Sequence, residues 1–135
     1  MVIVTGPKLK YATNELEQIE ACIPVTKTKE PITKLVTLKS GTKKDVISHL
    51  PKTSIAHFAC HGIQGTQNPL KSALILENGE LVVSQIMQHP SSNGMLAFLS
   101  ACQTAMGDKT LPDEVIHLAS TLLFAGFPGV VATMW

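Results

Sequence analysis

The order of apolar and polar positions along the chain predicts strands that alternate with helices. A short β-branched run at residues 2–4 predicts a buried strand, which Gly6-Pro7 closes. Residues 12–23 carry apolar side chains at helical spacing and glutamates on the other face, which predicts an amphipathic helix ended by Pro24. Residues 35–38 then predict a second strand.

The middle of the chain continues this alternation. Thr42-Lys43-Lys44-Asp45 resembles a capping box, with Asp in place of the usual Glu or Gln, and opens a helix that Pro51 ends. Residues 55–60 predict a third strand that leads directly into His61-Gly62, and residues 63–71 have the composition of an exposed loop.

The remaining pattern predicts a hairpin and then a further strand, helix and strand. The hairpin has arms at residues 73–76 and 81–82 around Asn78-Gly79. The later elements are a short helix at 84–88, a fourth strand at 95–99, a helix that begins near Pro112 and Asp113 and ends at Gly126, and a fifth strand from residue 129.

This order predicts an α/β fold with a mainly parallel central sheet and helices on both faces. At 135 residues we expect one domain over residues 1–135. Hydrophobic residues make up 44% and charged residues 16%, which suits a sheet buried on both faces. Because the last apolar strand needs cover that the sequence does not supply, we expect a partial domain, incomplete at the C-terminal edge of the sheet.

Charge and targeting signals restrict the class of partner. The formal net charge is +1, and no run of Lys or Arg exceeds two residues, so neither nucleic acid nor a membrane is expected as a partner. The apolar run at the amino terminus is too short for a signal peptide, and no apolar stretch reaches the ~18 residues of a membrane span. We therefore expect a cytoplasmic protein whose three cysteines are free thiols.

Two reactive side chains follow neighbouring positions in this predicted order. His61 follows the third strand and Cys102 follows the fourth. Ligands bind beyond the carboxyl ends of the strands in open parallel sheets. If the two strands are neighbours, about 4.8 Å apart, the thiol and the imidazole converge as a nucleophilic pair. The N–H groups of Gly62 and Cys102 could then hold an oxyanion.

Structural interpretations of the same residues stay open at this point. Cys102 could be a small core residue, and His61 a histidine of a turn. Cys60 and Cys22 are interpreted as a core or surface thiol, and His57 as a core histidine with a hydrogen-bond partner. A zinc site built on His57, Cys60, His61 and Cys102 is disfavoured, because strand alternation spreads the first three over both faces and no C-x-x-C spacing occurs. No metal or cofactor is predicted.

The residues around both reactive positions resemble the signature blocks of a known family. HFACHG at 57–62 and LSACQTA at 99–105 are similar to the two signature blocks of CHAT domains, caspase-like modules often fused to tetratricopeptide repeats. Residues 113–119 and 125–135 match further blocks in order and spacing. The likeness runs from about residue 40 to the end and is similar to the versions found in fungal proteins.

The resemblance implies a three-layer α/β/α caspase-like fold and hydrolysis of peptide bonds through a thioester. His61 would be the catalytic histidine and Cys102 the nucleophile, with the N–H groups of Gly62 and Cys102 as oxyanion donors. The expected partner is a polypeptide substrate, and no cofactor is implied. The family pattern continues past Trp135, which agrees with a partial domain.

Two questions remain open from the sequence. Asp113 is either a charge at a helix amino terminus or an acidic wall that favours a basic P1 residue. The alternative to a protease is a catalytically silent CHAT-type module that binds a regulatory protein partner, or a truncated fragment.

Overall fold

Strands and helices alternate along the chain as the sequence pattern predicts. The computed structural model describes residues 1–7, 9, 11–23, 34–63, 65, 68–100 and 115–132. The helices in these ranges are α1 (Ala12–Cys22), α2 (Lys43–His49), α3 (Val83–Met87) and α4 (Val115–Phe124), with short 3-10 turns at Leu50–Lys52 and Pro69–Lys71. The strands are β1 (Val2–Thr5), β2 (Val36–Leu38), β3 (Ile55–Ala59), β4 (His61–Ile63), β5 (Ala73–Leu76), β6 (Gly79–Val82), β7 (Leu96–Leu99) and β8 (Gly129–Ala132).

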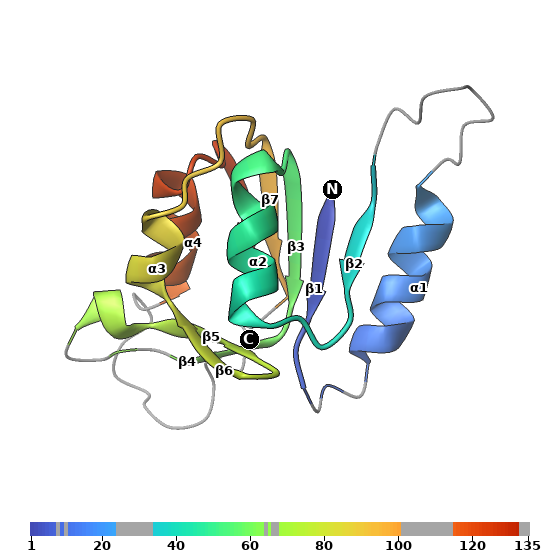
Figure 1. Ribbon diagram of the computed structural model, residues 1–135, viewed down its shortest axis with the longest axis horizontal. Helices are drawn as coiled ribbons and strands as arrows, with labels where there is room; N and C mark the ends of the chain where they lie inside the picture. The colour runs from blue at the N-terminus through green and yellow to red at the C-terminus, as the bar shows by residue number, and fades with distance from the viewer. Residues whose placement is uncertain are drawn as a thin grey trace.

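A five-stranded sheet forms the centre of the molecule (Figure 1). Its strand order is β2-β1-β3-β7-β8, and every neighbouring pair is parallel. The α/β fold class with a mainly parallel sheet is therefore confirmed. Because β3 lies between β1 and β7, the sheet places the strand before His61 in its middle.

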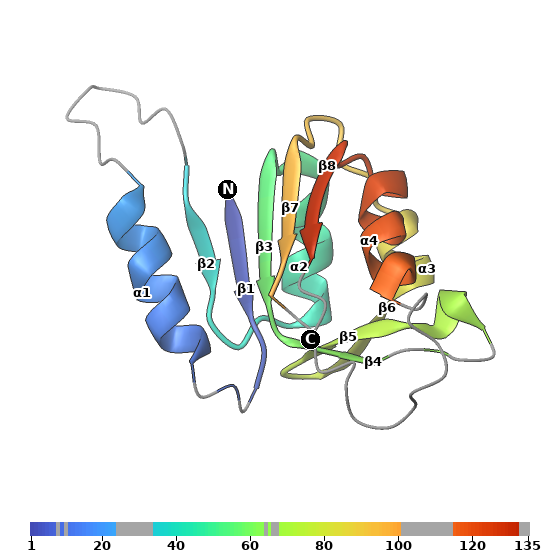
Figure 2. The same ribbon diagram turned by 180° about the vertical axis from the view of Figure 1, so that it is seen from behind.

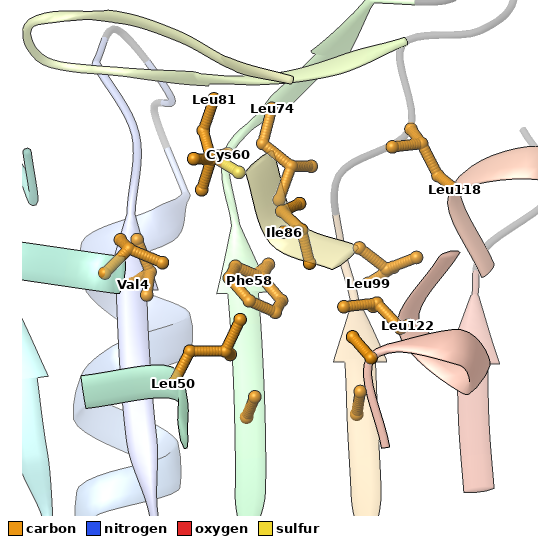
Figure 3. Packing of buried hydrophobic residues seen from close by; sticks show 14 of the residues in the cluster. Val4, Leu50, Phe58, Cys60, Leu74, Leu81, Ile86, Leu99, Leu118 and Leu122 are labelled. Atoms are coloured by element: carbon orange, nitrogen blue, oxygen red, sulfur yellow. The ribbon is translucent and has the colours of Figure 1, made fainter. Parts of the chain in front are cut away.

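The apolar core lies on the face of the sheet that α2, α3 and α4 cover. Val4, Phe58 and Leu99 point to this side from three adjacent strands and are buried. Figure 3 shows Phe58 among Leu50 and Ile86, which come from the elements above the sheet. Figures 1 and 2 show α2 in front of the sheet in one view and behind it in the other. Because side chains alternate along a strand, every second residue of each strand faces this layer.

Helix α1 lies on the opposite face. Glu15 of α1 contacts His57, and Glu20 of α1 accepts a hydrogen bond from Thr37 Oγ1 at 2.8 Å. His57 and Thr37 alternate with the residues that face the apolar core, so these contacts belong to the second face. Leu16 of α1 is buried there. The arrangement has the three layers that the sequence analysis expected.

A small antiparallel sheet crosses the carboxyl edge of the parallel sheet (Figures 1 and 2). Its order is β4-β5-β6, and β5 and β6 form the predicted hairpin, with Gly79 at a φ of +115°. The sequence pattern does not predict strand β4, because residues 63–71 have the composition of an exposed loop. Its residues pair with β5 instead: His61 opposite Ile75 and Ile63 opposite Ala73. The pairing is non-local and leaves no periodic signal in three residues.

Local capping chemistry fixes the ends of two helices. The predicted capping box is present: Asp45 N–H donates to Thr42 Oγ1, and the Asp45 carboxylate accepts from Thr42 N–H. Hydrogen bonding from Thr42 holds the pKa of the Asp45 carboxyl below its usual value. After α4, Gly126 adopts a φ of +90°, and Phe127 N–H donates to the Leu122 carbonyl, which is a Schellman ending.

Replacing Thr42 by Ala should destabilise the fold modestly. The change removes the side-chain oxygen that accepts from Asp45 N–H, so the free energy of unfolding should fall by about 1 kcal/mol in urea titration. Lys44→Ala is the matched control, because Lys44 lies exposed in the same helical turn and should change stability by less than about 0.5 kcal/mol. Equal effects of the two substitutions would contradict the capping assignment.

Candidate active site

The two strands that precede the predicted catalytic residues are neighbours. β3 and β7 pair in parallel, with Phe58 opposite Leu99. Ser100 N–H continues the ladder by donating to the Phe58 carbonyl at 2.9 Å. The condition on which the sequence argument depended is therefore met, since both strands end at the same edge of the sheet.

His61 lies just beyond this edge. β3 ends at Ala59, whose carbonyl accepts a hydrogen bond of 2.9 Å from Gly6 N–H on the β1 side. Gly6 is required there, because a Cβ on it would lie 2.5 Å from Cys60 Cβ. The chain bends at Cys60 and continues as β4, which starts at His61. His61 is partly exposed, and no hydrogen bond joins its imidazole to another described residue.

The other predicted site residues divide between described and undescribed parts of the chain. Gly62 follows His61 in β4, opposite Leu74, and is partly exposed. Cys102 and Asp113 fall outside the described residues. The pairing of His61 with Cys102, the two oxyanion donors and the role of Asp113 thus stay predictions.

Cys60 is a core residue, as the sequence analysis interpreted it. Its side chain is 1% exposed and belongs to the apolar cluster, where Figure 3 shows it beside Leu74 and Leu81. Burial raises the pKa of the Cys60 thiol to about 12, so the thiol stays protonated at neutral pH. A thiolate is the reactive form of cysteine, which makes Cys60 unsuited to nucleophilic attack. Cys22, at the end of α1, is an exposed free thiol.

His57 is the core histidine with a partner that the sequence predicts. The residue is 5% exposed, and its Nε2 lies 3.1 Å from Oε1 of Glu15. Burial lowers the pKa of the His57 imidazole, and the charge of Glu15 opposes this shift. His57 contacts α1 while Cys60 lies in the apolar cluster on the other face, so the two do not share a zinc site. Among the described residues no three metal-binding side chains come together.

Glu15 is the residue whose place the sequence reasoning missed. The helical pattern put it on the polar face of α1, yet its Oε1 also accepts a hydrogen bond of 2.7 Å from Ser100 Oγ. A sequence signal did exist: His57 interrupts an apolar strand, and a buried imidazole requires a polar partner. The pattern did not reveal which residue supplies it.

The carboxyl edge also carries a hollow of about 620 Å³. It lies at the ends of β1 and β2, beside Gly6, and its polar lining includes Thr5, Lys39 and Glu77. A second hollow of about 600 Å³ lies at the opposite edge, where Val2 and Ile55 begin their strands. In open parallel sheets the carboxyl edge is the one that binds ligands, which favours the first hollow.

A family model for the CHAT domain matches residues 2–135. The chain belongs to the CHAT domain family. This family is caspase-like, so the resemblance of HFACHG and LSACQTA is confirmed at the level of the family. No curated protein matches the chain. Within the described ranges, no helix of this CHAT domain combines the length and apolar character that crossing a membrane requires.

The two described cysteines of the CHAT domain should differ sharply in reactivity. In the folded protein at pH 8, iodoacetamide should alkylate the exposed Cys22, whereas Cys60 should react only after denaturation, because its thiol is buried and its pKa is about 12. Peptide mapping by mass spectrometry measures both. Alkylation of Cys60 at the rate of Cys22 without denaturant would contradict the placement of Cys60 in the core.

Proposed function

We propose that this CHAT domain is a cysteine endopeptidase in which Cys102 and His61 form the catalytic pair. One observation carries the proposal: β3 and β7 are adjacent and parallel, with Phe58 opposite Leu99. His61 is three positions beyond Phe58, and Cys102 is three positions beyond Leu99. The two reactive residues thus follow paired positions by the same interval.

The covalent reach of the chain supports the same pairing. Cys102 is two residues beyond Ser100, which is held to β3 through the Phe58 carbonyl. Two residues of chain span at most about 7 Å. Neighbouring strands lie about 4.8 Å apart, so a thiol within this reach is near the edge where His61 begins β4.

Acylation would begin with proton transfer from the Cys102 thiol to His61. The thiolate sulfur attacks the carbonyl carbon of the peptide, and the carbonyl electron pair moves to oxygen. The N–H groups of Gly62 and Cys102 stabilise this oxyanion. When the tetrahedral intermediate collapses, the C–N bond breaks and the His61 imidazolium gives its proton to the leaving amine, which leaves a thioester on Cys102.

Deacylation would reuse the same groups. His61, neutral after protonating the amine, accepts a proton from water as the water oxygen attacks the thioester carbon. The C–S bond then breaks, the peptide leaves as a carboxylic acid, and the sulfur regains a proton through His61. An imidazole suits both directions of transfer because its ordinary pKa is near neutrality.

The substrate of this proposal is a polypeptide that lies along the carboxyl edge of the sheet. The hollow beside Gly6 offers room there for a side chain, and Lys39 and Glu77 supply one charge of each sign. Asp113 is proposed as an acidic wall that favours a basic P1 residue, and the alternative is a charge at the start of its helix.

A proteolytically silent interaction module is the second candidate. Large apolar side chains of α4 and β8 are exposed: Leu123 by 48%, Phe124 by 74% and Val131 by 50%. A protein partner that covered them would gain apolar burial. In this candidate the biological effect would survive loss of the Cys102 thiol.

Substitution of the proposed nucleophile separates the two candidates. The purified chain should cleave members of a proteome-derived peptide library, and Cys102→Ala should reduce new termini to the level without protein, because no other group replaces the sulfur. Mass spectrometry of the new termini also reveals the P1 residue, and a preference for Lys or Arg supports the role of Asp113.

Cys22→Ala is the matched control, since it removes an exposed thiol from the end of α1 and should leave cleavage unchanged. Circular dichroism establishes that each variant is folded. Undiminished cleavage by Cys102→Ala would refute the proposed nucleophile. A folded chain that cleaves nothing would favour the silent module.

A further inference from the structure

A hydrogen-bonded network of three side chains joins α1, β3 and the end of β7. Oε1 of Glu15 accepts from Ser100 Oγ at 2.7 Å and lies 3.1 Å from Nε2 of His57. These residues are far apart in sequence, 42 positions between Glu15 and His57 and 85 between Glu15 and Ser100. We call this group the Glu15 network. It lies on the face of the sheet away from the apolar core.

The Glu15 network is partly buried between α1 and the sheet. The His57 side chain is 7% exposed and that of Glu15 is 37% exposed. A carboxylate only accepts hydrogen bonds, so the Ser100 hydroxyl and the His57 ring must both act as donors. Burial lowers the pKa of His57, which favours the neutral ring, and the contact with Glu15 then assigns its proton to Nε2.

Ser100 is held from two directions. Its backbone N–H donates to the Phe58 carbonyl, and its hydroxyl donates to Glu15 on α1. The first bond fixes Ser100 against β3, and the second fixes it against the helix layer. Cys102 follows two residues later in the sequence. These two bonds therefore fix Ser100, the last described residue before the segment that carries Cys102.

We propose that Glu15 and His57 are positioning residues that act through Ser100 to hold the Cys102 thiol in line with His61. This inference rests on the proposed function, because a positioning role presupposes that Cys102 and His61 act as a catalytic pair. His57 orients the Glu15 carboxylate, the carboxylate binds the Ser100 hydroxyl, and Ser100 fixes the start of the segment that carries the nucleophile.

Attachment of α1 to the sheet does not by itself require this network. The helix is also held by the hydrogen bond from Thr37 of β2 to Glu20, at 2.8 Å, and by buried Leu16. The Thr37–Glu20 bond joins the same helix to the same face of the sheet, but β2 is separated from β7 by β1 and β3. It is therefore a matched control for a purely structural role.

The test compares Ser100→Ala with Thr37→Val in the full chain. Ser100→Ala should lower kcat by about ten- to hundredfold with little change in KM, because a displacement of about 1 Å at a nucleophile has that effect. It should also move the pH midpoint of Cys102 alkylation toward about 8.5, the value of an ordinary thiol. Thr37→Val should change neither quantity, and Ser100→Thr, which keeps the hydroxyl, should restore both.

Glu15→Gln provides a second variant if Ser100→Ala does not fold, since it keeps the side-chain shape while weakening the acceptor. Folded Ser100→Ala or Glu15→Gln protein that matches Thr37→Val in alkylation profile and kcat would overturn the inference. The alkylation profile does not depend on proteolysis. If the unmodified chain cleaves no peptide but Ser100→Ala still shifts the profile, the proposed proteolysis fails while the positioning role stands.

Discussion

The parallel pairing of β3 with β7 is the constraint on which the candidate site depends. Because Phe58 lies opposite Leu99, both strands end at the same edge, and the chain segments that follow them start from adjacent points. The pairing is stabilised from the apolar face, where Phe58 and Leu99 are buried beneath α3 and α4, and it continues through Ser100 N–H to the Phe58 carbonyl. A shift of one residue in this register would exchange the two faces and move His57 into the apolar core.

Residues of β3 and the bend that follows it lie in different environments, because side chains alternate between the two faces. His57 faces α1 and contacts Glu15, Phe58 enters the apolar core, and Cys60 is buried beneath the small sheet. His61 follows as the first residue of β4, where the chain has left the central sheet. The HFACHG block thus contains two histidines in different environments: a buried one bonded to Glu15, and a partly exposed one at the carboxyl edge.

Much of this arrangement could be predicted from residues that carry local signals. Thr42 and Asp45 predict the start of α2, and Gly126 predicts the end of α4. The apolar run before His61 predicts a buried strand. The missed features depend on non-local partners. Strand β4 forms because β5 pairs with it. Glu15 contacts the sheet because His57 and Ser100 donate hydrogen bonds to its carboxylate. A helical pattern cannot reveal such donors, since they belong to residues 42 and 85 positions away along the chain.

The central claim is that residues 61 and 102 meet at the carboxyl edge, and disulfide trapping tests it most directly. In a Cys22→Ala background, which removes the exposed competing thiol, His61→Cys should form a disulfide with Cys102 under mild oxidation, because a bridge requires Cα atoms within about 7 Å of each other. Mass spectrometry of the digested protein should find the cross-linked peptides, and Ile63→Cys, two residues further along β4, should form the bridge less readily. A folded His61→Cys protein that yields no 61–102 disulfide would contradict the proposed catalytic pair.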